Sequence, residues 1–357
     1  MSNNKAKEFL AHAGLAADQN AIVDLADDFI RQMELGLSTD PSPSSLKMLP
    51  TYLGLDMDLE PFDSVIVMDA GGTNFRICLV HFDNEGDHHI SEFKTCLMPG
   101  VEREVSKDEF YDFFAQALLP YLSSSRKIGF CFSFPCSITP EGDGLVLGFT
   151  KEVKCPEAIG SLVGHSIKER LVSLGASPDI HISILNDTVS TLLGGFAHSK
   201  LKGIPYDSYA GLVFGTGINM AYVEELENIT KLPTDFKGPG PMLINTEAGN
   251  YNADNLTSVD KIIDQGSQFP GTYAFEKQTS GRYMGPQVYF TLKQAIEAGL
   301  FSEGFAQGFK KFETLEAVQL DQFLKSPTGK NPLAGLCQTF EDRENLYILI
   351  DNAYERA

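Results

Sequence analysis

Two glycine-rich segments, far apart in the sequence, have the composition of phosphate-binding turns. The first is Asp69–Arg76 (DAGGTNFR) and the second is Gly215–Asn219 (GTGIN), and each lies between two apolar, β-branched runs. A strand, a glycine turn and a second strand expose backbone N–H groups and a hydroxyl to an anion, with no side chain in the way. The two turns therefore predict a pair of hairpins that could hold one polyphosphate between two halves of the molecule.

The first turn also carries charged side chains that suit a metal–phosphate site. Asp69 ends the preceding apolar run, and its carboxylate could hold Mg²⁺ through water, because this metal keeps much of its hydration shell. Gly71, Gly72 and Thr73 could donate to phosphate, and Arg76 is a second candidate phosphate contact. The alternative interpretation of the first turn is an ordinary glycine-rich hairpin. The second turn alone is a weak indication of phosphate binding, and it supports this function only because it matches the first in position and flanking residues.

Two further apolar runs end on polar residues. The segment Ile184–Thr188 places Asn186 and Asp187 directly before a helical pattern. Because ligands of open α/β sheets lie beyond the carboxyl ends of the strands, Asp187 is suitably placed as a general base toward a hydroxyl. A helix cap is the alternative interpretation of this pair. Ser133 ends the run Phe130–Pro135 in the same way, and either a ligand contact or a plain buried strand end would explain it.

Glu247 and Glu276 are acids in glycine-rich surroundings, within the segments Asn245–Gly249 and Pro270–Lys277. Carboxylates and amides suit a sugar, because each vicinal hydroxyl can donate to one acceptor. Such a site rejects an analogue that lacks a hydroxyl, since a buried acceptor is then left unpaired. Taken singly, each glutamate is more typical of a solvated surface acid.

The bulk composition is that of a globular protein and argues against some partners. The 357 residues allow two domains, and 43% of them are hydrophobic and 21% charged. A net charge of −20 argues against nucleic acid or an anionic membrane surface as the main partner. The six cysteines lack zinc-ligand spacing and are expected to be reduced core thiols. Without a secretory leader or an apolar run of about 18 residues, the chain is expected to be cytoplasmic and not membrane-spanning, while its oligomeric state stays open.

The predicted elements repeat in part. After an amphipathic helix over Asp18–Leu37, the first half has the order β-β-β-α-β-α-β-α, and the second half opens with a matching hairpin at 209–224. A Pro/Gly/Asn-rich region at 233–271 and helical segments follow, so either the second half is built differently or the chain stops before its last strands. The expected elements are a hairpin at 64–82, strands at 92–97, 128–134 and 181–185, and helices at 106–122, 161–174, 188–198, 286–298, 302–324 and 338–356.

Together these segments resemble the hexokinase family, within the actin-like sugar-kinase superfamily. The resemblance implies an α/β, two-lobed actin-like ATPase (ribonuclease H-like) fold, in which duplicated units surround a cleft and the second unit is incomplete. It also implies an N-terminal helical segment at 1–61, a small lobe at 62–187 and a large lobe at 188–357. The matching stretches occur in family order and are Leu46–Tyr52, Asp69–Arg76, Gly129–Pro135, Asn186–Leu193, Gly215–Asn219, Ile244–Gly249 and Pro270–Gly285.

The same resemblance implies Mg-dependent transfer of the ATP γ-phosphoryl group to the 6-hydroxyl of a hexose, with glucose as the expected substrate and Asp187 as the catalytic base. The sugar would be surrounded by Ser133, Phe134, Thr150, Lys151, Asn186, Asn219, Glu247 and Glu276. The first phosphate loop would comprise Asp69, Gly71, Gly72, Thr73, Asn74 and Arg76, with Asp69 at the metal, and the second Gly215, Thr216 and Gly217.

Several positions depart from the family pattern. The segment Gly148–Glu152 lacks the usual Trp and Gly around its Thr-Lys pair, Ala248 stands where an aromatic residue is usual, and Pro286 replaces an acid. Family members also continue for about 100 residues past the helix that Tyr347–Ala357 resembles, so we expect a truncated chain without the adenosine site. A non-catalytic hexose-binding sensor is therefore an alternative. Another actin-like phosphotransferase is a third possibility, but it does not explain the two glutamates.

Overall fold

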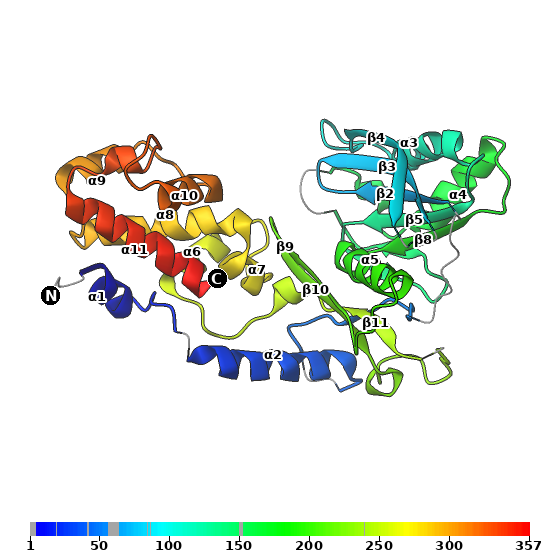
Figure 1. Ribbon diagram of the computed structural model, residues 1–357, viewed down its shortest axis with the longest axis horizontal. Helices are drawn as coiled ribbons and strands as arrows, with labels where there is room; N and C mark the ends of the chain where they lie inside the picture. Colours follow the sequence, from blue (N-terminus) through cyan, green and yellow to red (C-terminus); the bar gives the residue numbers. More distant parts are fainter. Residues whose placement is uncertain are drawn as a thin grey trace.

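The structure, a computed structural model, describes residues 5–18, 20–40, 43–55, 64–83, 85, 87–149, 153–238 and 240–357. Figure 1 shows an elongated molecule, with a five-stranded sheet and its helices at one end, a group of helices at the other, and a second sheet between them. Among the described residues, none of the helices combines the length and the apolar character needed to cross a bilayer.

The five-stranded sheet brings together the strand ends of the first half. Its strands are β2 (Val65–Ala70), β3 (Asn74–Phe82), β4 (His88–Leu97), β5 (Lys127–Phe132) and β8 (His181–Leu185), and β6 (Cys136–Ile138) and β7 (Gly144–Val146) form a small separate hairpin. The order is β4-β3-β2-β5-β8, with β2 antiparallel to β3 but parallel to β5, and β5 parallel to β8. The carboxyl ends of β2, β5 and β8 therefore meet at one edge, where such sheets bind ligands.

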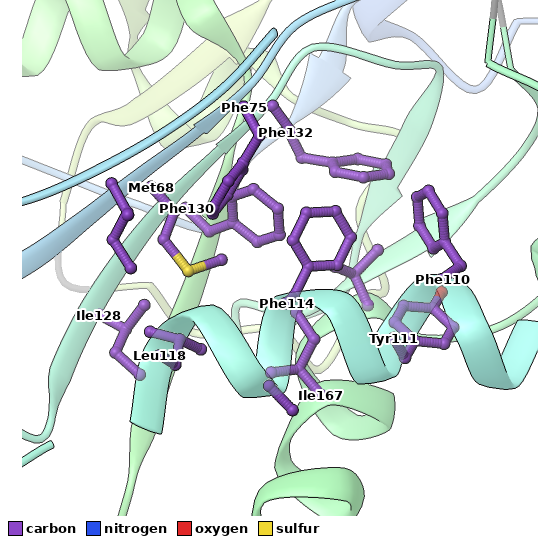
Figure 2. Close-up of a cluster of buried hydrophobic side chains, with 14 of the residues drawn as sticks. Met68, Phe75, Phe110, Tyr111, Phe114, Leu118, Ile128, Phe130, Phe132 and Ile167 are labelled. Atoms are coloured by element: carbon purple, nitrogen blue, oxygen red, sulfur yellow. The ribbon is translucent and has the colours of Figure 1, made fainter. Parts of the chain in front are cut away.

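One face of this sheet packs on the helices α3 (Lys107–Leu118) and α4 (Val163–Ser173) through the aromatic core in Figure 2. Side chains alternate along β5, and this alternation turns Phe130 into the core. Phe114 of α3 packs on Phe130 with ring centroids 5.2 Å apart and meets Phe110 edge to face at 5.0 Å. Because a slip of one residue would expose these rings, the core sets the register of the strands and so the position of their ends.

Helix α5 (Asp187–Leu201) follows β8 and packs against the second sheet, so it joins the two halves of the molecule (Figure 1). Val189 and Leu192 of α5 form a buried cluster with Ala221 and Leu243 of that sheet. Helix α5 contacts both sheets, so it does not mark a clear division between two lobes. The lobe boundaries near residues 62 and 188 therefore stay predictions. The second sheet has the order β1-β11-β10-β9 and consists of β1 (Leu49–Pro50), β9 (Ala210–Phe214), β10 (Ile218–Glu224) and β11 (Met242–Asn245).

Strand β11 lies in the Pro/Gly/Asn-rich region at 233–271, to which no strand is assigned from the sequence. It pairs antiparallel with β10, which gives β9-β10-β11 the same antiparallel arrangement as β2-β3-β4. Its four residues are all buried, so they lack the alternation by which a half-exposed strand is recognised. In the described part of the chain no strand follows β11, and β9 has no parallel neighbour of the kind that β5 provides for β2.

The remaining helices form a separate core at the other end of the molecule. The expected single helix at 302–324 is wrong, because Glu316 and Gln319 form a capping box that begins a new helix, while Leu315 just before it is buried. Helix α1 (Lys5–His12) joins this core, and α2 (Ala21–Leu37) packs near the second sheet. The other helices are α6 (Ser258–Gln265), α7 (Ala274–Thr279), α8 (Gly281–Glu297), α9 (Glu303–Phe309), α10 (Ala317–Lys325) and α11 (Phe340–Arg356).

Replacing Gly211 by alanine should destabilise the fold, because a Cβ there would lie 2.2 Å from the carbonyl oxygen of Thr188 in α5. Overpacking of this kind costs about 1–3 kcal/mol. Gly195→Ala on the exposed side of α5, where a Cβ would meet no atom within 4 Å, should instead stabilise by about 0.5–1 kcal/mol. Urea unfolding followed by circular dichroism measures both changes, and equal stability of the two variants would contradict the close approach.

Candidate active site

A cleft of about 720 Å³ runs between the strand ends of the first half, the tip of the β9–β10 hairpin, and the helices α6 to α8. Of the residues singled out from the sequence, it is lined by Ser133, Phe134, Asn186, Asp187, Thr216, Gly217, Asn219, Glu247 and Glu276. The fold thus brings together polar groups from both halves of the chain. Thr150 and Lys151 lie outside the described residues.

Asn186 and Asp187 begin helix α5 on one wall of the cleft. Oδ1 of Asn186 accepts hydrogen bonds from the backbone N–H and the hydroxyl of Thr188, at 2.9 and 2.5 Å, so Asn186 is the helix cap that the alternative interpretation required. Asp187 also lines the cleft, with Oδ1 2.9 Å from the same N–H. The partial positive charge at a helix N-terminus favours an ionised carboxylate in this place.

The carboxylates of Asp69 and Asp187 both influence the thiol of Cys131, a half-buried residue of β5. Burial first, and then the carboxylates of Asp69 and Asp187, raise the pKa of Cys131 to about 12. Arg76 donates to Oδ2 of Asp69 at 2.6 Å, and the two residues face each other across the β2–β3 pair. The described residues hold no cluster of three metal-ligating side chains. A single carboxylate beside a phosphate loop fits Mg²⁺, which is commonly held by one or two carboxylates together with water and substrate phosphates.

The two glycine turns leave backbone donors available. Gly71 donates to the carbonyl of Asn74 at 3.0 Å and Gly215 to that of Gly217 at 2.9 Å, which closes each turn. Within the described residues, the next N–H groups of each turn donate to no backbone acceptor; they belong to Gly72, Thr73, Thr216 and Gly217. The second turn lines the cleft, whereas the first does not. That both turns hold one polyphosphate therefore stays a prediction.

Asn219 connects the two walls. Its Nδ2 donates to Oδ1 of Asn245 at 2.8 Å and lies 3.3 Å from Oδ1 of Asn186 and from the hydroxyl of Thr188. Asn245 in turn donates from Nδ2 to Oε1 of Glu247 at 2.9 Å. A continuous line of hydrogen bonds thus runs from the start of α5 to the acid beyond β11.

Glu276 of α7 reaches the second glycine turn. Its Oε2 accepts from the backbone N–H of Ile218 at 3.3 Å, and a Cβ on Gly217 would lie 2.5 Å from that oxygen. Gly249 is similarly close, with a Cβ there 3.2 Å from Cβ of Glu276. A side chain at position 217 would therefore displace the Glu276 carboxylate, and one at position 249 would crowd Cβ of Glu276 and the carbonyl of Ile218.

Three side chains near the cleft were not selected from the sequence as site residues. Asn245 lies within a selected segment, but only its acidic neighbour was assigned a role. Tyr273 lines the cleft, and burial together with the carboxylates of Glu247 and Glu276 raises its pKa. Lys277 also lines it, although its side chain is 4% exposed. In the sequence, these residues were marked only by their closeness to Glu247 and Glu276. Closeness along the chain does not distinguish a residue that lines a cleft from one on the outer surface.

The fold that surrounds this cleft is that of a known class of proteins. The structure has the two-lobed actin-like ATPase fold of hexokinases. It matches the hexokinase from Schistosoma mansoni, solved as a complex with glucose, with a TM-score of 0.73 and 23% sequence identity over 99% of this chain and 83% of that one. A second hexokinase structure gives a TM-score of 0.72 with 20% identity.

The family follows from the sequence comparisons. Hexokinase family models match residues 6–196 and 209–357, and the chain belongs to the hexokinase family. Hexokinase-1 of Rattus norvegicus is 31% identical over 297 residues, which are 79% of this chain and 31% of that protein. Hexokinase-2 of Oryza sativa subsp. japonica is 31% identical over 303 residues, 81% of this chain and 60% of that protein. The chain thus spans about a third of the length of the rat relative.

Lys277→Met should destabilise the cleft wall by about 1–3 kcal/mol, because Nζ donates to Oδ1 of Asp264 at 2.6 Å and to the carbonyl of Phe269 at 2.7 Å. Among the donors in the described residues, Asp264 would keep only the N–H of Gly271, and the carbonyl of Phe269 only the N–H and the hydroxyl of Thr272. The loop 266–273 would therefore be held less firmly. Lys325→Met, which removes a salt bridge whose side chains are 76% and 49% exposed, is the matched control and should change stability by less than about 0.5 kcal/mol. Chemical unfolding measures both.

This difference should also depend on pH. The hydrogen bond from Lys277 holds the pKa of Asp264 below its usual value. A carboxyl whose pKa is lowered by folding stabilises the fold above its unfolded pKa, and the contribution is lost as the pH falls through the folded value. The stability gap between the unmodified chain and Lys277→Met should therefore shrink as the pH falls from about 6 to about 3. A gap that stays constant over this range would contradict the ion pair.

Proposed function

We propose that the chain transfers the γ-phosphoryl group of ATP to the 6-hydroxyl of a hexose, and that D-glucose is such a hexose. The observation that carries the proposal is one cleft that joins the helix-start carboxylate of Asp187 with the acceptors Glu247 and Glu276 from the other half. Membership of the hexokinase family supports the reaction class. The glucose complex of the Schistosoma mansoni hexokinase, which shares the fold, supports the sugar.

In this proposal Asp187 takes the proton of the 6-hydroxyl as that oxygen bonds to phosphorus and the bond to the departing ADP breaks. Phosphoryl transfer depends mainly on positioning and on neutralising charge, with the base orienting the nucleophile. Ser133 and Asn186 would contact the sugar from one wall, and Asn219, Glu247 and Glu276 from the other. Contacts from both walls favour closure of the cleft, and closure excludes the water that would otherwise hydrolyse ATP.

The nucleotide would be held by the two glycine turns. The N–H groups of Gly72, Thr73, Thr216 and Gly217, which donate to no backbone acceptor in the part of the chain that the structure describes, are suitable phosphate donors. Arg76 supplies a guanidinium beside Asp69, and Asp69 would hold Mg²⁺ through water. When bound, the metal would neutralise charge on the phosphate oxygens.

Asp187→Ala should lower kcat by about 10²–10⁴, because the variant loses the base, while sugar affinity changes by only a few fold. A coupled assay of ADP release with glucose and Mg-ATP measures kcat, and calorimetry measures glucose binding. An effect on kcat below about tenfold would contradict the assignment of the base.

The same measurements separate the kinase from a hexose-binding sensor. The departures at Gly148–Glu152 and Ala248 are the observations that favour a sensor. A kinase should bind both hexose and nucleotide and release ADP. Tight hexose binding without nucleotide binding or turnover would instead support the sensor.

Gly217→Ala should weaken hexose binding by about tenfold or more, because the new Cβ would displace the carboxylate of Glu276 from its place. Gly215→Ala is the matched control on the same turn, since a Cβ there would meet no atom within 4 Å. Calorimetric titration with glucose compares the two variants. Equal glucose affinity in both would show that Glu276 does not depend on the space at Gly217.

A further inference from the structure

Asn245 ends strand β11 and is 6% exposed. Its carboxamide lies between two groups of the proposed hexose site. Oδ1 accepts from Nδ2 of Asn219 at 2.8 Å, and Nδ2 donates to Oε1 of Glu247 at 2.9 Å. The backbone N–H of Glu247 lies 3.3 Å from the same Oδ1. One buried amide thus contacts both an amide and a carboxylate of the cleft wall.

Backbone donors determine the direction of these hydrogen bonds. Oδ1 of Asn219 accepts from the backbone N–H groups of Met220 at 2.8 Å and Ala248 at 3.1 Å, so its Nδ2 must face Asn245. Asn245 therefore presents its oxygen to Asn219 and has only N–H groups left for Glu247. The donor to the carboxylate follows from the fold and does not depend on a free choice of amide orientation.

Glu247 combines a strained backbone with a single side-chain donor to its carboxylate among the described residues. Its φ is +56°, in the left-handed region that residues with a Cβ rarely adopt. Its carbonyl accepts from the N–H of Asn250 at 3.0 Å, which holds the backbone turn. Of the Glu247 carboxylate oxygens, only Oε1 receives a protein donor among the described residues, and that donor is Asn245. The other oxygen remains for a ligand hydroxyl.

We propose that Asn245 is a positioning residue that sets hexose affinity by orienting the Glu247 carboxylate and the Asn219 amide. The proposal rests on the proposed function, because it deepens the role of the same cleft. Asn245 itself need not touch the sugar. Its loss should therefore weaken binding of the hexose while leaving the nucleotide and the chemical step largely unchanged.

Asn245→Ala should raise both KM and Kd for glucose by about 10- to 100-fold, the effect of losing a hydrogen bond to a charged group. We expect KM for Mg-ATP to stay within about twofold and kcat within about threefold. Asn252→Ala is the matched control, because Asn252 is exposed and does not line the cleft. Its glucose affinity should equal that of the unmodified chain.

The variant Asn245→Asp tests whether Asn245 acts by orienting the Glu247 carboxylate or only by stabilising the fold. The introduced carboxyl has the shape of the amide, and the like charge of Glu247 beside it raises the pKa of the pair. At low pH the proton they share can replace the lost N–H donor, whereas at high pH two carboxylates repel. The other titratable or charged groups that line the cleft among the described residues are Asp187, Tyr273, Glu276, Lys277, Arg282 and Tyr283, and all of them are present in the unmodified chain as well.

Calorimetric titration with glucose between about pH 5.5 and 8 gives the decisive comparison. We expect Kd of Asn245→Asp to rise at least tenfold across this range, and Kd of the unmodified chain to stay nearly constant. Glucose binding by the unmodified chain with unchanged binding by Asn245→Ala would overturn the inference alone. Equal loss by Asn245→Asp at every pH would also overturn it. No glucose binding by the unmodified chain would overturn the proposed function, and this inference with it.

Discussion

The close packing of helix α5 against strand β9 determines where the two walls of the cleft stand. Gly211 permits the approach, because any Cβ there would collide with the backbone of α5. The same helix follows directly from β8, so its first residues lie at the carboxyl edge of the five-stranded sheet. One helix thereby holds Asn186 and Asp187 at a fixed place relative to the hairpin of β9 and β10. Interiors packed at this density shift little without cost.

Hydrogen bonds then fix the side chains on the two walls of the cleft that the packing has positioned. The line from Asn186 through Asn219 and Asn245 to Glu247 contains only groups whose donors and acceptors match. In a partly buried cleft such matching affects stability more than the strength of any one bond. An unmatched polar group loses its hydrogen bonds to water and gains none in the protein. On the other side, the Lys277–Asp264 ion pair clamps the loop ahead of Glu276. Glu247 thus receives a hydrogen bond from a neighbouring side chain, and Glu276 receives one from the backbone N–H of Ile218.

Much of the fold was predictable because its signals are local. The apolar runs at β2, β5 and β8 and the glycine turns follow directly from residue type, and their order indicated the family. Strand β11 was missed because four buried residues show no alternation, and the break between α9 and α10 was missed because a capping box inside an apolar pattern is easily read as continuous helix.

Only those site residues that follow strands or stand in glycine-rich segments were predictable from the sequence. Ser133, Asp187 and Glu247 could be selected because they follow strands or stand in glycine-rich segments. Asn245 could not be assigned a role, since its partners, Asn219 and Glu247, become informative only once β10 and β11 are paired. Contacts that depend on strand pairing are not visible as spacing along the chain.

The central claim is that a hexose binds with its 6-hydroxyl at Asp187 and its other hydroxyls at the acids of the opposite wall. A crystal structure of the chain with D-glucose tests this most directly. The account predicts the 6-hydroxyl within hydrogen-bond distance of the Asp187 carboxylate, with Glu247 and Glu276 each accepting from a different hydroxyl. Glucose bound outside this cleft, or bound with its 6-hydroxyl directed away from Asp187, would contradict it.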